Sequence, residues 1–193
     1  PKDQNVTNTD SGAQAQSRSI NTRRNSFYIK GDFGTVRLGD HNDVGDGIVH
    51  VGAAGTFTTN SLSGAGYTHN SAFAGDMGGF DPHRGQGFRY YSPKIAGIAT
   101  VGVQTQNGGG NEIAIRINTN GFKLGYYQED TGSDTDKKGV LLGYKAPIGL
   151  SATYTQSESE TAGVEDQYDA FQVGYHTGKH KLSILKGTRD KPS

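Results

Sequence analysis

The feature that most constrains this chain is a period-two alternation of apolar and polar residues, clearest in its second half. Over residues 112–118, every second side chain is an isoleucine, and alanine, arginine and asparagine lie between them. The same alternation returns over 122–128, 139–145, 150–156 and 168–176. Because successive side chains of a strand point to opposite faces, this spacing predicts strands with one apolar and one polar face.

The connections between the predicted strands alternate in length. Ten strands are predicted, at residues 26–31, 34–40, 86–92, 98–106, 112–118, 122–128, 139–145, 150–156, 168–176 and 180–186. Tight turns are predicted at 31–34, 93–97, 120–121, 146–149 and 177–179; the Asn-Gly pair at 120–121 is the strongest hairpin signal. Longer polar connections are predicted at 41–85, 107–111, 129–138 and 157–167, with a tail from Gly187. The lengths predict an antiparallel sheet with tight turns at one end and long loops at the other.

Composition excludes several classes of protein. The chain has no cysteine, so it can form neither a disulfide framework nor a thiolate zinc site. Its 19 basic and 19 acidic residues balance, so no overall field would attract nucleic acid. No run approaches the roughly 18 apolar residues that a membrane helix needs. A membrane barrel remains possible, because strands that alternate lipid-facing and water-facing residues have an unremarkable mean hydropathy.

Two all-β architectures explain the alternation. A soluble sandwich would bury the apolar faces between two sheets. A transmembrane barrel would turn them toward lipid, and it would also explain the alternating turn lengths and the tyrosines near strand ends. Those tyrosines are Tyr90, Tyr91, Tyr126, Tyr127, Tyr144, Tyr154 and Tyr175.

Two segments resemble motifs of general porins of Gram-negative outer membranes. RNSFYIKGDFGTVRLGD, residues 24–40, is similar to the family's strand, short periplasmic turn and Gly-Thr-Val-Arg-Leu-Gly strand. FRYYSPKIAGIATVGVQ, residues 88–104, is similar to a later strand-turn-strand with Tyr-x-Ser-Pro at its turn. Between them, residues 41–85 occupy the place of the family's long third loop, which folds inward and narrows the pore. The resemblance covers the chain from about residue 24 onward.

The resemblance implies an antiparallel β-barrel of the 16-stranded type, of which about ten strands are present. Family members end on an aromatic residue, whereas this chain stops at Gly187-Thr-Arg-Asp-Lys-Pro-Ser193. We therefore expect residues 1–193 to form one incomplete barrel domain, with a polar loop or frayed entry at 1–23 and a constriction loop at 41–85.

The resemblance also implies a passive diffusion channel, selective where carboxylates on the inward loop face arginines on the opposite wall. Asp76 and Asp81 are the favoured acids, because the glycines of AGDMGGFD let the backbone turn tightly. Asp43 and Asp46 are further candidates, although aspartate also commonly forms turns.

Basic candidates for the pore wall are Arg23, Arg24, Arg37, Arg89, Arg116, Lys123 and Lys145. Arg37 and Arg89 are expected to point at water inside the barrel. The family usually has another arginine just after its Gly-Thr-Val-x-Leu-Gly segment, where this chain has Asp40. The preference between anions and cations therefore stays open.

The expected partners follow from the resemblance: outer-membrane lipid and lipopolysaccharide, two further copies in a homotrimer, and ions and small hydrophilic solutes. No nucleic acid is expected, because basic and acidic residues balance. No cofactor is expected, because the chain has neither a Walker-type lysine loop nor a dinucleotide glycine fingerprint. No enzymatic activity is expected, because no nucleophile can be placed beside a base. The six histidines lack paired ligand spacing for zinc. Glu129, Asp130, Asp134 and Asp136 could bind calcium in an outer loop, although a solvated acidic loop is the simpler interpretation.

Two alternatives remain at this stage. A porin selective for sugars or oligosaccharides would carry an aromatic track, for which Phe57, Tyr67, Phe73 and Phe80 are candidates. A soluble sandwich acting as an adhesin or carbohydrate-binding module would purify without detergent.

Overall fold

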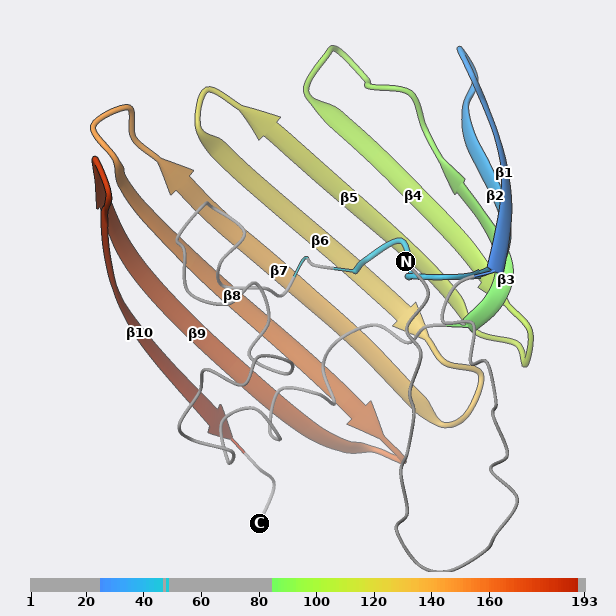
Figure 1. Ribbon diagram of the computed structural model, residues 1–193. Coiled ribbons are helices and arrows are strands. Elements are labelled where there is room, and N and C mark those ends of the chain that lie inside the picture. Colours follow the sequence, from blue (N-terminus) through green and yellow to red (C-terminus); the bar gives the residue numbers. More distant parts are fainter. Residues whose placement is uncertain (1–24, 47, 49–84, 191–193) are drawn as a thin grey trace, which may run out of the picture.

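The computed structural model describes residues 25–46, 48 and 85–190, which form one ten-stranded antiparallel sheet (Figure 1). Each strand pairs with the next along the chain. The strands are β1 (Asn25–Gly31), β2 (Gly34–His41), β3 (Gly85–Tyr91), β4 (Ala99–Gln106), β5 (Asn111–Thr119), β6 (Phe122–Asp130), β7 (Thr135–Lys145), β8 (Leu150–Thr161), β9 (Val164–Thr177) and β10 (His180–Asp190). Within these residues, no helix is long and apolar enough to cross a membrane.

The sheet curves into a trough, with its tight turns gathered along one edge (Figure 1). All five predicted tight turns are confirmed by the strand boundaries. Asn120 and Gly121 have φ values of 45° and 84°. Both residues are therefore left-handed, as a two-residue hairpin of this type requires.

Three predicted long connections at the opposite edge are wrong. β7 already begins at Thr135, β8 and β9 are separated by Ala162 and Gly163 alone, and β10 continues to Asp190. These segments are mostly polar on both faces, so the alternation of apolar and polar residues is lost there, although the strands remain paired. A strand that extends beyond an apolar layer meets water on both sides, and polarity alone does not distinguish it from a loop.

The convex face of the sheet carries large apolar side chains that the described residues leave exposed. They include Phe27, Ile29, Leu38, Phe88, Val103, Ile113, Ile115, Phe122, Leu124, Leu142, Phe171, Leu182 and Ile184. A sandwich would cover this face with a second sheet. The described strands form one sheet, and the apolar face lies bare.

The limit of this apolar surface crosses the strands diagonally. The last outward apolar residue before polar ones is Ile113 on β5 and Ile184 on β10. The chain of direct cross-strand partners that starts at Ile113 runs through β6, β7, β8 and β9 and ends at Asp190 on β10. Asp190 lies six residues beyond Ile184. Six residues of about 3.3 Å over five strand spacings of about 4.8 Å correspond to a tilt of about 40°. Strands of transmembrane barrels have this tilt. At this tilt, the apolar surface would form a band of constant height along the barrel axis.

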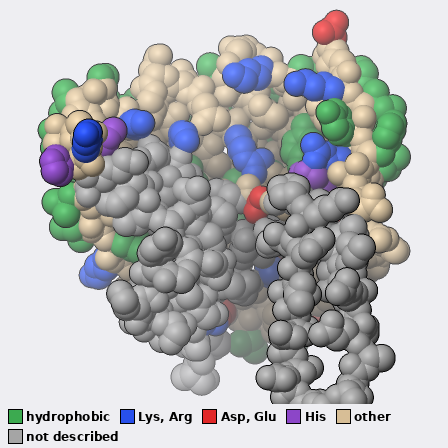
Figure 2. Space-filling model, viewed as in Figure 1, with side chains coloured by type: hydrophobic (Ala, Val, Ile, Leu, Met, Phe, Trp, Pro, Cys, Tyr) green, Lys and Arg blue, Asp and Glu red, His purple; other side chains and the backbone are tan. Residues whose placement is uncertain are grey.

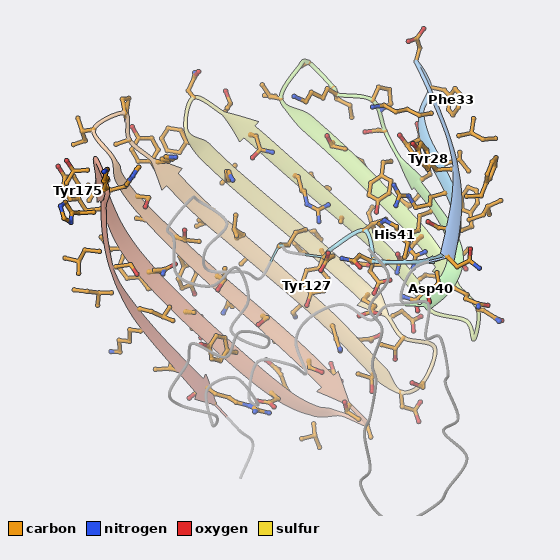
Figure 3. All side chains as sticks on the ribbon, in the orientation of Figure 1. Tyr28, Phe33, Asp40, His41, Tyr127 and Tyr175 are labelled. Atoms are coloured by element: carbon orange, nitrogen blue, oxygen red, sulfur yellow. The ribbon has the colours of Figure 1, made fainter. Side chains whose placement is uncertain are left out.

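The tyrosines that a barrel was expected to explain do not all lie on its outer face. Tyr126 and Tyr154 lie at the limit of the outward apolar surface, and their hydroxyls donate to polar neighbours, Gln128 Oε1 at 3.0 Å and Asp169 Oδ1 at 2.5 Å. Such side chains suit a boundary between lipid and water. Tyr127, in contrast, lies inside the trough and is fully buried, whereas Tyr175 lies outside it (Figure 3).

Candidate pore-wall site

A row of polar side chains crosses the concave face at one level of the sheet. Its members are direct cross-strand neighbours on β1 to β7: Tyr28, Arg37, Arg89, Gln104, Glu112, Glu129 and Lys137. Directly opposed side chains have Cβ atoms about 5 Å apart. The strand pairing thus places two arginines, two glutamates and a lysine in one line.

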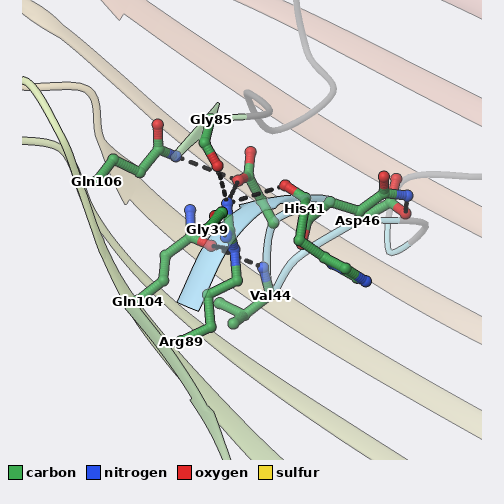
Figure 4. Close-up of polar contacts among 10 residues, drawn as sticks. Gly39, His41, Val44, Asp46, Gly85, Arg89, Gln104 and Gln106 are labelled. Carbon is green, nitrogen blue, oxygen red and sulfur yellow. Dashed lines mark hydrogen bonds and ion pairs between the residues drawn. The ribbon is translucent and has the colours of Figure 1, made fainter. Parts of the chain in front are cut away.

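Arg89 is the most heavily bonded residue of this row, and it is fully buried. Its Nε donates to Gln104 Oε1 at 2.8 Å, and its Nη1 donates to the Gly39 carbonyl at 3.1 Å. Its Nη2 donates to the carbonyls of His41, at 2.9 Å, and Gly85, at 2.7 Å (Figure 4). One guanidinium therefore fixes the end of β2 to the start of β3.

Asp43 forms a buried ion pair with Arg89. Its Oδ1 lies 3.1 Å from Arg89 Nη2, and both side chains are 0% exposed. The same oxygen accepts a hydrogen bond from Gln106 Nε2 at 3.2 Å. The Asp43 carbonyl also accepts from the Asp46 amide at 3.2 Å, so this aspartate makes a turn and an ion pair together.

Residues 42–46 and 48, here called the loop root, lie against the concave face. Arg116 donates from Nη1 to the Val44 carbonyl and from Nη2 to the Asp46 carbonyl, the latter at 2.7 Å. The Val44 amide donates to Gln104 Oε1 at 3.1 Å. Two arginines on the wall thus hold the start of the connection that follows β2.

Apolar contacts complete the loop root. Val44 and Ile48 form a buried cluster with Ala114, Tyr127 and Leu141 of the wall. Glycines leave room for them: a Cβ on Gly102 would lie 2.8 Å from Val44 Cβ, and one on Gly125 would lie 3.0 Å from Ile48 Cγ2. The wall is shaped to receive this segment.

The geometry is that of a curved sheet with a bare apolar exterior and a chain segment folded against its polar interior. Residues 3–190 match the model of the Gram-negative porin family. The chain belongs to this family. A search of curated proteins found no match. As a Gram-negative porin, this protein resides in the outer membrane.

The porin buries two carboxylates that sequence reasoning did not place on the pore wall. Glu112 and Glu129 face each other across β5 and β6, and both are almost fully buried. Glu112 lies against the loop root, because a Cβ on Gly45 would come within 2.1 Å of its Oε1. Glu112 could have been found from the sequence, because it lies four residues from Arg116 on β5 and therefore shares its face of the strand. Glu129 was considered only as a weak calcium candidate of an outer loop, because residues 129–138 were predicted to form a loop, whereas it lies on β6.

The predicted basic residues do not gather in one place in this porin. Arg89 and Arg116 hold the loop root, and Arg89 is buried rather than turned toward water as expected. Arg37 is half-buried at the end of the row, with its guanidinium carbon 5.4 Å from the centre of the Tyr28 ring. Lys123 and Lys145 lie near the tight turns, away from the loop root.

Several predicted residues fall outside the described part of the chain: Arg23, Arg24, Asp76, Asp81, Phe57, Tyr67, Phe73 and Phe80. Asp134 and Asp136, the weak calcium candidates, are exposed. Over residues 25–46, 48 and 85–190, no group of three metal-binding side chains comes together.

Proposed function

We propose that this porin is a passive diffusion channel for ions and small hydrophilic solutes, narrowed by the connection between β2 and β3. The observation that carries the proposal is the loop root held on the concave face. A connection that begins inside the trough and returns to β3 at Gly85 has its two ends joined by Arg89. Its remaining residues, including Asp76 and Asp81, are then available to reach across the bore.

The size of the barrel supports a role for this connection as a constriction. Strands about 4.8 Å apart and tilted about 40° close at a radius of roughly 16 Å for sixteen strands and roughly 10 Å for ten. Side chains occupy about 5 Å of either radius. An inward loop would plug the smaller barrel but would leave an aqueous passage in the larger one, so we propose the sixteen-stranded type.

We further propose that Asp76 and Asp81 provide the acidic side of the constriction. A carboxylate in a narrow water column attracts cations and repels anions along the whole passage. The wall arginines nearest the loop root are already bonded, Arg89 to Asp43 and Arg116 to backbone carbonyls. We therefore expect Asp76 and Asp81 to have a larger effect on selectivity than these two arginines.

Reversal potentials in a salt gradient across a planar bilayer test this function. The porin is expected to conduct, and the Asp76→Asn/Asp81→Asn variant is expected to shift its preference toward anions by several-fold in permeability ratio. The matched control is Asp134→Asn/Asp136→Asn, which removes two exposed carboxylates at the edge of the sheet, outside the constriction, and is expected to shift the preference less. Absence of conductance would reject the channel. An equal shift in both variants would reject the assignment of Asp76 and Asp81.

The family assembles into oligomers, and we propose a homotrimer that contacts lipid and lipopolysaccharide through the rest of its exterior. The bare apolar face is compatible with both kinds of contact. Chemical cross-linking in detergent micelles, followed by gel electrophoresis, would give a trimer band if this is right and a monomer band if it is not.

A further inference from the structure

The tight-turn edge of the sheet is strongly basic. Each of the five tight turns has a lysine in it or within two residues of it: Lys30, Lys94, Lys123, Lys145 and Lys179. Over residues 30–35, 92–98, 118–123, 143–151 and 174–182, lysines outnumber acids by six to one, the acid being Asp32. Lys and Arg side chains gather along the upper rim in Figure 2, where these turns lie in Figure 1.

The opposite edge is acidic. Four carboxylates lie side by side on β6 to β9, as direct cross-strand neighbours: Asp130, Asp136, Glu160 and Glu165. Over residues 128–138, 156–169 and 186–190, acids outnumber lysines and arginines by ten to four. Among these bases, Lys138 pairs with Glu158 at 2.8 Å and Arg189 pairs with Asp166. The balanced total charge of the chain therefore conceals a separation along the strands.

A hollow of about 500 Å³ opens between three neighbouring turns at the basic edge. Its lining includes Asn120, Lys145, Ile148, His176 and Thr177, and it contains no acidic residue. Lys145 and His176 are both exposed there. The hollow offers a hydrated anion a place beside a lysine before it enters the bore.

The two edges are far enough apart to act separately. β7 has 11 residues, which at about 3.3 Å each and a tilt of about 40° span about 28 Å. The Debye length is about 10 Å at 0.1 M salt. Each mouth therefore sets its own local concentration of counter-ions at moderate salt, with little cancellation from the other.

We propose that this porin is an electrically polarised channel whose tight-turn mouth collects anions and whose opposite mouth collects cations. Lys94, Lys145 and Lys179 are the specificity-determining residues of the basic mouth. The inference rests on the proposed diffusion function, because it concerns the ions that such a channel admits from each side. A channel with mouths of opposite charge passes unequal currents at equal and opposite voltages.

Single-channel currents in symmetric KCl test the polarity. At 0.05 M salt, the currents at equal and opposite voltages are expected to differ by about 1.5-fold or more, and at 1 M the ratio is expected to approach one because salt screens the mouths. Equal currents at 0.05 M through a conducting channel would overturn the polarity and leave the diffusion function standing. A protein that does not conduct would overturn both.

Charge variants test which residues are responsible. Lys94→Gln/Lys145→Gln/Lys179→Gln is expected to reduce the asymmetry at 0.05 M by at least half. The matched control, Lys138→Gln/Lys186→Gln, removes lysines near the acidic edge and is expected to increase the asymmetry. A decrease of similar size in both variants would overturn the assignment of the basic mouth.

A chemical variant avoids any dependence on comparing separate preparations. Because the chain has no cysteine, Lys145→Cys introduces a single thiol, and a reagent applied to one side also reports the orientation of the channel. Compared with the same channel before modification, a cationic thiol reagent is expected to increase the asymmetry, and an anionic reagent, applied to a second unmodified channel, is expected to reduce it. Identical effects of the two reagents would exclude an electrostatic role for this position.

Discussion

The inner wall of the trough is built in two different ways on its two sides. On β3 and β5, two arginines reach over the sheet and hold the loop root: Arg89 pairs with the Asp43 side chain, and Arg116 donates to the Asp46 carbonyl. On β8, the buried inward residues are Ser151, Thr153, Thr155 and Ser157, which carry short hydroxyls and no charge. The loop root is therefore fixed electrostatically from one side of the trough, while uncharged hydroxyls line the other side.

Removing the guanidinium of Arg89 should have the largest effect. Arg89→Met would leave Asp43 buried without its ion pair, and breaking such a pair costs about 3–5 kcal/mol. The chain has no tryptophan, so unfolding in detergent with urea is best followed by far-UV circular dichroism. The double variant Arg89→Met/Asp43→Leu should recover much of the loss, and a double variant as unstable as the single one would contradict the ion-pair explanation.

Truncation of Ile48 should come next. Ile48→Ala empties part of the buried cluster with Tyr127 and Leu141, and such truncations cost about 2–5 kcal/mol. The same unfolding measurement applies. Ile184→Ala, on the exposed convex face, is the control and should cost clearly less in detergent. Equal losses of stability in Ile48→Ala and Ile184→Ala would mean that Ile48 is not packed against the wall.

Crowding the loop root should have a smaller effect. Gly102→Ala places a Cβ 2.8 Å from Val44 Cβ, and overpacking of this kind costs about 1–3 kcal/mol. Val44→Gly in the same chain removes the Val44 Cβ and should relieve the clash, so the double variant is expected to lose less stability than the two single losses added together. Additive losses would show that Gly102 and Val44 are not in contact.

The neutral side of the wall should tolerate the smallest change. Thr155→Val removes a buried hydroxyl that has no hydrogen-bond partner among the described residues, so the stability should change by less than about 1 kcal/mol in either direction. A loss comparable to that of Arg89→Met would mean that β8 also holds the loop, and the contrast between the two sides of the wall would disappear.

The strands and turns were largely predictable because their signals are local. Side-chain alternation identified all ten strands, and the Asn120-Gly121 pair has the backbone conformation that its sequence predicts. Strand ends were predicted less well. Residues 129–138 and 157–167 are polar in both phases, so the sequence contained no periodic signal there, and only the hydrogen-bonded register extends the strands through them.

The wall site was predicted in part. Arg89, Arg116 and Asp43 were all candidates. Their positions in the sequence could not reveal that Arg89 pairs with Asp43, because the two residues lie 46 positions apart. Glu129 was hidden by the loop assignment, and its pairing with Glu112 depends on the β5–β6 register.

By itself, the sequence determined which side chains share a face, where the chain turns tightly and to which family it belongs, because alternation, turn chemistry and motifs are properties of neighbouring residues. Tertiary structure alone decided that Arg89 is buried against Asp43, that the loop root lies on the wall, and that lysines and carboxylates separate to opposite edges. These features arise when register aligns distant residues on adjacent strands, and no local pattern encodes that alignment.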